Sequence, residues 1–128
     1  MPGIDQYNRI AKIALTRPIV SKTASYTLKI EESGSVVIAN HATVAVVFTL
    51  PAVASSEGVY YRFFNIGAAE MDITAPTGTL VSDGSASTTT IAFAVTDHII
   101  GGAAMVVCDG TYWYAFCAKN LSAVPAFS

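Results

Sequence analysis

Charged side chains are scarce in this chain: Lys, Arg, Asp and Glu make up only 12% of its 128 residues, whereas apolar residues make up 52%. The charged fraction is about half that of an average soluble domain. A single domain of this length has a large surface for its volume, and so few charges cannot cover it. We therefore expect a homo-oligomer or a docking surface hidden in a larger assembly, and a surface of Ser, Thr, Gly and Ala is the alternative.

Long apolar runs are also missing. Apolar stretches such as Val44 to Phe48 are far shorter than the roughly 18 residues that a membrane-spanning helix needs. Residues 1–22 carry a charge every few positions and have no central apolar block, so we expect no signal peptide. If the protein acts outside a cell, we expect it to leave by a route other than secretion, for example inside an assembled particle.

The residues that most often carry catalysis or bind metals are few. The two histidines, His41 and His98, do not stand in a paired-ligand spacing, and no GxSxG or phosphate-binding glycine motif occurs. Cys108 has no nearby cation in the sequence that would activate a thiol. Glu31-Glu32 are adjacent in a predicted turn, where we expect them to be solvated. We therefore expect no enzyme, no metal site and no cofactor.

A hairpin signal allows the two cysteines to be placed relative to each other. Asp109-Gly110 lies between two apolar runs, which is the strongest short hairpin pattern. With this pair at the centre of the turn, the cysteines share a face but lie about six residues, or roughly 20 Å, apart. A disulfide needs Cα atoms within about 7 Å, so both thiols are predicted to be free. This register pairs Cys108 with Thr111, Val106 with Trp113, Ala104 with Ala115, and Gly102 with Cys117.

The charges that are present are unevenly distributed. Residues 1–25 carry four of the seven cations and one acid, which gives +3, whereas residues 26–128 carry three cations and eight acids, which gives −5. The first segment has no clean strand or helix period. We interpret it as an extended arm with apolar anchors; a short helix that ends near Arg17, before Pro18, is the alternative. The net charge of −2 and the lack of a basic stripe in the body argue against a nucleic-acid partner.

The rest of the chain has the pattern of a β-domain at residues 26–118, followed by a tail at 119–128. Apolar and polar residues alternate in short segments, and turn residues recur every 8–12 positions. The pattern predicts an all-β fold, either an antiparallel β-sandwich or a small, jelly-roll-like β-barrel. Strands are expected over residues 26–30, 36–39, 44–50, 59–66, 71–74, 85–94, 99–108 and 111–117.

Aromatic residues are concentrated in the last predicted strand. Alternation puts Tyr112, Tyr114 and Phe116 on one face, with Met105 and Val107, and Trp113 on the opposite face. They cannot form one flat sugar-stacking platform, so we prefer packing in the core or between subunits. Both faces of the hairpin are apolar, so we expect one to cover the core and the other to contact a neighbouring subunit or layer. The expected packing residues are Phe48, Leu50, Phe63, Tyr112, Trp113, Tyr114 and Phe116.

Several short motifs together resemble a β-domain of bacteriophage virion proteins. They are VAVVFTLP at residues 44–51, YYRFFNIG at 60–67, MDITAPTG at 71–78 and VVCDGTYWYAF at 106–116. The pattern covers about residues 26–116. Such domains occur in capsid decoration (cement) proteins, head fibres and tail-fibre segments. The resemblance implies a trimeric β-structure on the outside of a phage particle.

A chain of this length with an arm, and without the extended shaft or repeats of a long fibre, is most similar to a capsid cement protein. The resemblance implies a homotrimer that is assembled in the host cytoplasm and binds the major capsid protein on the outer surface of the virion, with no membrane partner. The alternative is a head-fibre or tail-fibre domain that binds a host receptor or carbohydrate through loops such as Ala52–Gly58 or Ser82–Thr88. On charge and pattern alone, we assign the capsid contact to Ile4, Tyr7, Arg9, Ile10, Lys12, Ile13, Leu15 and Arg17.

Overall fold

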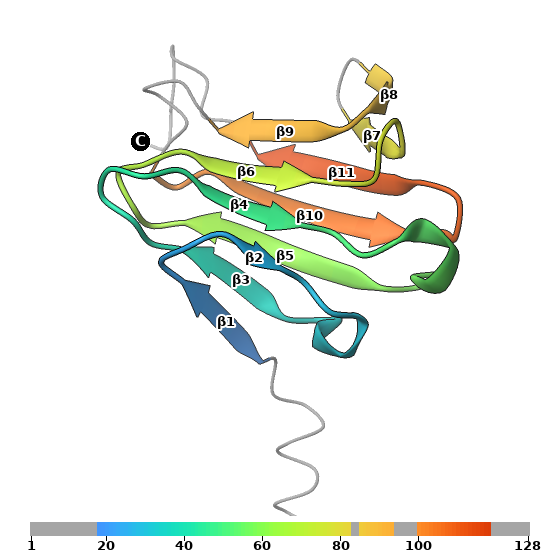
Figure 1. The fold of residues 1–128 in the computed structure, drawn as a ribbon, viewed down its shortest axis with the longest axis horizontal. Coiled ribbons are helices and arrows are strands. Elements are labelled where there is room, and N and C mark those ends of the chain that lie inside the picture. The colour runs from blue at the N-terminus through green and yellow to red at the C-terminus, as the bar shows by residue number, and fades with distance from the viewer. Residues whose placement is uncertain (1–17, 83–84, 94–99, 119–128) are drawn as a thin grey trace, which may run out of the picture.

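The computed structural model describes residues 18–82, 85–93 and 100–118, which form short β-strands and two single-turn 3-10 helices. Figure 1 shows the strands arranged in two layers. The all-β prediction is confirmed. The elements are β1 (Ile19–Lys22), β2 (Tyr26–Thr27), η1 (Ile30–Glu32), β3 (Val36–Ala39), β4 (Val46–Thr49), η2 (Val53–Ser55), β5 (Tyr60–Asn65), β6 (Met71–Thr74), β7 (Leu80–Ser82), β8 (Ser85–Thr88), β9 (Thr90–Phe93), β10 (Ala103–Cys108) and β11 (Trp113–Ala118).

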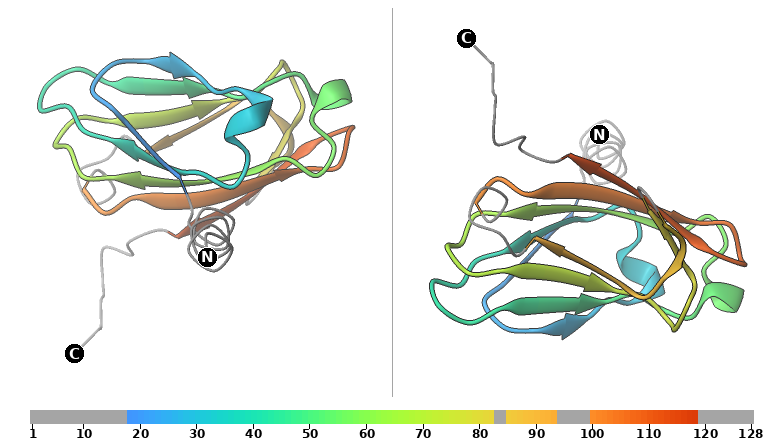
Figure 2. Two further views of the ribbon diagram at one scale, coloured as in Figure 1. Left: turned by 90° about the horizontal axis from the view of Figure 1, so that it is seen from below. Right: turned by 90° about the horizontal axis from the view of Figure 1, so that it is seen from above.

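The strands belong to two sheets that face each other. Sheet A has seven strands in the order β1-β3-β5-β10-β11-β7-β8, and sheet B has four in the order β2-β4-β6-β9. The views in Figure 2 show the two sheets as separate layers. Their facing sides close on one core, in which the ring centroids of Phe48 (β4) and Phe63 (β5) lie 5.6 Å apart.

The predicted antiparallel pairing is wrong for the pairs that the first six strands form with one another, whereas β5 with β10 and β6 with β9 do pair antiparallel. β1, β3 and β5 pair in parallel in sheet A, and β2, β4 and β6 pair in parallel in sheet B. From β1 to β6, consecutive strands lie in opposite sheets, so each connection crosses from one sheet to the other. The chain therefore winds around the core and runs in the same direction each time it returns to a sheet. Hairpins instead pair consecutive strands. Among the described strands, β7–β8 and β10–β11 are consecutive and pair in this antiparallel way.

Sheet B carries the same short motif on each of its parallel strands. Tyr26-Thr27-Leu28, Phe48-Thr49-Leu50 and Ile73-Thr74-Ala75 lie side by side, because Tyr26 pairs with Phe48 and Phe48 pairs with Ile73. The residues on either side of each threonine contribute to the core or pack against it. On the next strand, β9, Thr90 pairs with Thr74, and the Oγ1 atoms of the two residues lie 3.1 Å apart. We call Thr27, Thr49, Thr74 and Thr90 the threonine ladder.

Two large aromatic rings tie sheet A to the loops at one end of the body. Trp113 stacks on Tyr61 with a centroid distance of 5.9 Å, and both side chains are fully buried. The Trp113 indole N–H donates to the carbonyl of Pro51 at 3.1 Å, and the Tyr61 hydroxyl donates to the carbonyl of Lys29 at 2.6 Å. Burial raises the pKa of Tyr61 well above its ordinary value. Both buried polar groups are therefore satisfied.

The connection from β5 to β6 crosses from one sheet to the other and depends on the buried side chain of Asn65. Its Nδ2 donates to the carbonyl of Ala69 at 2.8 Å, and its Oδ1 accepts the N–H of Gly67 at 3.0 Å. A Cβ at position 67 would lie 2.5 Å from both the backbone N and the backbone O of His41. This close approach of two backbones requires glycine.

The β10–β11 hairpin forms where the sequence predicts it, with a different register. Cys108 pairs with Trp113 rather than with Thr111, and Ala104 pairs with Cys117. The shift is an even number of residues, so the predicted faces are unchanged. Both cysteines are free, as predicted.

β1 lies inside residues 1–25, the segment that we interpret as an arm. It pairs in parallel with β3, and hydrogen bonds close both ends: the Pro18 carbonyl accepts the Val36 N–H at 2.9 Å, and the Lys22 carbonyl accepts the Asn40 N–H at 3.0 Å. The interpretation of this segment as an extended arm is therefore wrong for residues 19–22, which belong to sheet A. Residues 1–17 and 119–128 lie outside the described residues.

Candidate assembly surface

The outer side of sheet A presents a broad apolar surface, which we call the A face. The strand registers align its side chains in rows across the sheet. The middle row consists of Ile19, Val36, Arg62, Met105 and Phe116; one flanking row consists of Ser21, Ile38, Phe64 and Ala103, and the other of Tyr60, Val107, Tyr114 and Val81.

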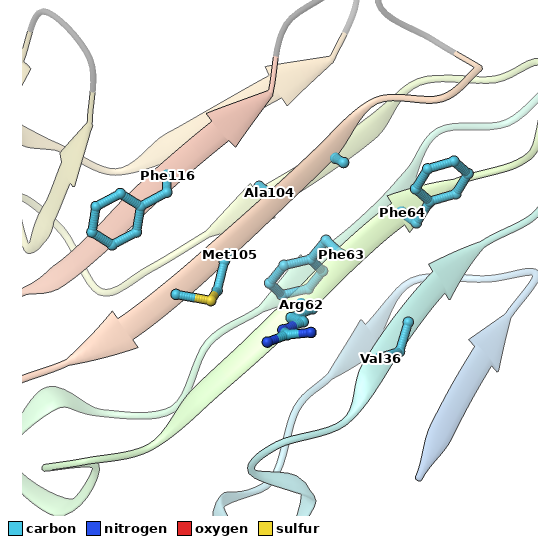
Figure 3. Close-up of a pocket in the computed structure, with 8 residues that line it drawn as sticks. Val36, Arg62, Phe63, Phe64, Ala104, Met105 and Phe116 are labelled. Atoms are coloured by element: carbon cyan, nitrogen blue, oxygen red, sulfur yellow. The ribbon is translucent and has the colours of Figure 1, made fainter. Parts of the chain in front are cut away.

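Large apolar side chains on the A face are open to solvent. The exposed fractions are 66% for Ile19, 61% for Phe116 and 42% for Phe64. A shallow groove of about 440 Å³ crosses β3, β5, β10 and β11 between such side chains. Figure 3 shows Phe64, Met105 and Phe116 around it. Contiguous apolar surface of this kind on a soluble protein marks an interaction site.

Arg62 is the one charged residue in these rows. It lies in the middle row, paired with Val36 on one side and Met105 on the other, and its side chain is exposed (Figure 3). Within the described residues it has no ion-pair or side-chain hydrogen-bond partner. A guanidinium in apolar surroundings can stack on an aromatic ring or bind a carboxylate supplied by a partner.

The outer side of sheet B differs in chemistry. It carries the threonine ladder and, beside it, a row of Val47, Asp72 and Ala92. The hydroxyl groups of the ladder suit the solvated side of a sheet. The contrast between the two outer sides makes the A face the candidate contact surface.

The one acid in these outer rows of sheet B lies close to a second acid. Burial, together with a hydrogen bond and a like charge from Glu70, raises the pKa of Asp72 to about 7. The Oδ1 atom of Asp72 is buried and has no hydrogen-bond partner. In the part of the chain that the structure describes, no group of three His, Cys, Asp or Glu residues is placed to hold a metal ion.

The tip of the β10–β11 hairpin is organised by Asp109. Gly110, with φ at 92°, and Thr111 occupy the central positions, and the Asp109 Oδ1 accepts the N–H groups of Thr111 and Tyr112, both at 2.8 Å. The Asp109 Oδ2 accepts the hydroxyl of Tyr114 at 2.7 Å. These hydrogen bonds, first that from Tyr112 and next that from Tyr114, lower the pKa of Asp109. They hold the turn one residue further along the chain than the sequence predicts.

The two tyrosines at this tip do not form a sugar-stacking platform. The rings of Tyr112 and Tyr114 meet edge to face, with centroids 6.4 Å apart and planes at 60°. Trp113, between them in the sequence, is fully buried on the other side of the sheet. This matches the alternation that the sequence predicts.

His41 and Cys108 have structural surroundings. The Nδ1 atom of His41 accepts the N–H groups of Thr43 at 3.0 Å and Val44 at 2.8 Å, which stabilises a turn. The Cys108 thiol is buried, and this burial is the main reason that its pKa is raised. The thiol donates to the carbonyl of Val53 at 3.6 Å. His98 lies outside the described residues.

The packing residues predicted from the sequence divide between the core and the exterior. Phe48, Leu50, Phe63 and Trp113 are buried in the core, with at most 3% exposure. Tyr114 and Phe116 lie on the A face, and Tyr112 lies at the hairpin tip. The share of β1, β3 and β5 in this face was not predicted, although the alternation in YYRFFN places Arg62 and Phe64 on one side.

The capsid-contact residues predicted for the arm lie outside the described residues, and the structure says nothing of them. They are Ile4, Tyr7, Arg9, Ile10, Lys12, Ile13, Leu15 and Arg17.

Comparisons with protein-family models, with curated proteins and with solved structures found no match. Within residues 18–82, 85–93 and 100–118, no helix is long and apolar enough to cross a membrane. A functional proposal therefore depends on the residues and the geometry of this chain.

Proposed function

We propose that this protein is a bacteriophage capsid decoration (cement) protein, which binds the outer surface of the major capsid shell as a homotrimer and stabilises it. The main support for a role in assembly is the A face, an apolar surface that crosses five strands and on which Phe116 is 61% exposed. The phage setting is supported by the resemblance of residues 26–116 to virion β-domains.

In this proposal, a β-sandwich body forms the trimer and the residues before β1 contact the shell. Residues 1–17 carry three cations and one acid, or +2, so three chains bring +6 to one site. Arg9, Lys12 and Arg17 would pair with acids on the shell, and apolar side chains such as Ile10 and Ile13 would fill grooves between capsomers. Three arms on one trimer bind neighbouring capsomers at once, so weak contacts become a clamp against internal DNA pressure.

The position of β1 supports a contact of this kind. β1 is an edge strand of sheet A, so the chain before Pro18 joins the body at its side and not through its core. Removal of residues 1–17 should therefore leave the two sheets intact.

A truncation tests the role of the arm. A deletion of residues 1–17, which retains β1, should give a folded oligomer of unchanged subunit number that no longer co-sediments with undecorated shells. A deletion of residues 119–128 is the matched control and should still bind. Binding of the first truncation with the affinity of the full chain would show that the arm is not the shell contact.

The number of copies on the particle separates the two virion roles. Quantitative mass spectrometry of purified virions should find copies of this chain in a number comparable to that of the major capsid protein. A handful of copies per particle, together with binding to a glycan array, would instead indicate the head-fibre or tail-fibre domain and overturn the decoration role.

A further inference from the structure

We infer that the A face is the surface through which the subunits of this protein meet, so that its occupant is a second copy of the chain. The inference rests on the proposed function for the trimer and adds to it the surface that holds the trimer together. It follows from the extent of the face, its charge and its place relative to β1.

The extent of the A face suits a subunit contact. The middle row has five positions and each flanking row has four, and each position covers about 4.8 Å by about 6.7 Å of the sheet. The flat area is then roughly 420 Å² per copy, and protruding side chains such as Phe116 increase it. Two such faces therefore approach about 1,000 Å², which is the lower bound for a specific interface.

The charge of the A face favours a second copy over the arm as its occupant. The face carries one cation, Arg62, which has no ion-pair partner among the described residues. The arm, residues 1–17, carries three cations and one acid and would bring further positive charge against Arg62, whereas the A face of a second copy brings only its own Arg62 among uncharged side chains. A second copy also brings exposed rings, Phe64 and Phe116, on which a guanidinium can stack.

The geometry of the sheet edge is compatible with this contact. Pro18 precedes β1, the edge strand of sheet A, so the described chain enters the sheet at the margin of the A face and not at its centre. The threonine ladder lies on the other outer side of the body and stays in water. Burial of the A face therefore covers the apolar side and leaves the polar side exposed.

Paired charge insertions on the two outer sides test the inference. The variant Phe64→Lys/Phe116→Lys changes two side chains that are already exposed, so its sheets should still form. The matched control, Thr27→Lys/Thr90→Lys, adds the same charge to exposed positions on sheet B. Light scattering and sedimentation equilibrium measure the mass in units of the 13.4 kDa subunit, and circular dichroism checks the fold.

We expect the full chain and the control variant to have a mass of three subunits, and the A-face variant to have a mass of 13.4 kDa. A second measurement uses the unaltered chain, so its result does not depend on whether a variant folds. Hydroxyl-radical oxidation of Met105 should rise on dilution below the assembly range. Met71, which is fully buried in the core, should stay protected throughout.

Three results would overturn the inference. They are a monomeric full chain at its highest soluble concentration, an A-face variant that keeps the oligomer mass, and Met105 oxidation that does not change on dilution. A deletion of residues 1–17 that becomes monomeric would show that the arm holds the subunits together. An oligomer that depends on the A face but does not bind shells would retain the inference and reject the proposed function.

Discussion

Asn65 offers a sharp test of how the two sheets are joined. Its side chain, 1% exposed, makes two buried hydrogen bonds within the β5–β6 connection, one to the carbonyl of Ala69 and one from the N–H of Gly67. Asn65→Ala removes both and leaves a buried donor and a buried acceptor without partners. Each unsatisfied group costs about 1–3 kcal/mol. We expect the free energy of unfolding to fall by about 3 kcal/mol.

The assay can use the protein's own fluorescence. Trp113 is the one tryptophan in the chain and is fully buried, so its emission reports the loss of the core in urea. The slope of free energy against urea should not change, whereas the midpoint should fall. The melting temperature should fall by about 10 °C. Protein concentration must be held constant, because assembly adds to apparent stability.

A second substitution at Asn65 probes the donor alone. Asn65→Asp keeps an oxygen for the Gly67 N–H but replaces the donor to Ala69 with a carboxyl oxygen. A protonated carboxyl can donate in place of the amide, whereas a carboxylate would face the carbonyl as a buried charge. Burial raises the pKa of the new carboxyl, so stability should be highest at low pH and should fall as pH rises through that value.

The control is Asn40→Ala, an exposed asparagine, which should change stability by less than about 0.5 kcal/mol. A loss of stability in Asn65→Ala no larger than that in Asn40→Ala would show that the two buried hydrogen bonds do not stabilise the β5–β6 connection. A difference in stability between Asn65→Asp and the unaltered chain that does not depend on pH would show the same for the bond to Ala69.

Two further predictions concern Asp72 and Cys108. The folded pKa of Asp72, about 7, lies above the ordinary carboxyl value of about 4, so its contribution to stability is complete below pH 4 and is lost as pH rises to 7. The free energy of unfolding of Asp72→Asn, measured in urea, should therefore equal that of the unaltered chain near pH 4. At pH 8 it should be higher by about 1 kcal/mol, a value that allows for solvent screening. An equal difference at both pH values would contradict this. Cys108 is 2% exposed, so iodoacetamide should label it in the folded protein far more slowly than Cys117, as peptide mass spectrometry would measure, and equal rates would count against the buried thiol.

Local signals in the sequence predict much of the strand content. The boundaries of β3 and β6 agree with the prediction, because alternating residues end at clear turn residues such as Asn40 and Pro76. The predicted strand at 26–30 is instead β2 followed by η1, where Glu32 accepts the N–H of Lys29 and the hydroxyl of Tyr26. These local hydrogen bonds compete with the strand.

The path of the chain between sheets could not be predicted in the same way. Alternation tells which residues of a strand share a face, but it does not tell which strand lies beside it. A weak signal was present: the T-L of Thr27-Leu28 and Thr49-Leu50 and the T-A of Thr74-Ala75 mark the strands that lie in register. A three-residue motif is too short to distinguish such a repeat from ordinary β-strand composition.

The A face was partly foreseen. The apolar alternation on both sides of the last hairpin indicates a second contact surface through Met105, Phe116 and their neighbours. The contribution of Ile19 could not be predicted, because its strand lies in the basic segment and pairs with β3 only through the long-range parallel register. The full extent of the A face therefore follows from the order in which the strands pair, which the sequence pattern does not predict.

The edge position of β1 has a mechanical consequence. A pull on the chain at Pro18 acts on the first residue of a strand that is bonded along its length to β3, from the Pro18 carbonyl to the Lys22 carbonyl. A force along the strand axis loads these hydrogen bonds together, in shear, and not one after another. If residues 1–17 grip a partner, tension in that grip passes through β1 into the middle of the sheet, and the body resists it as a unit.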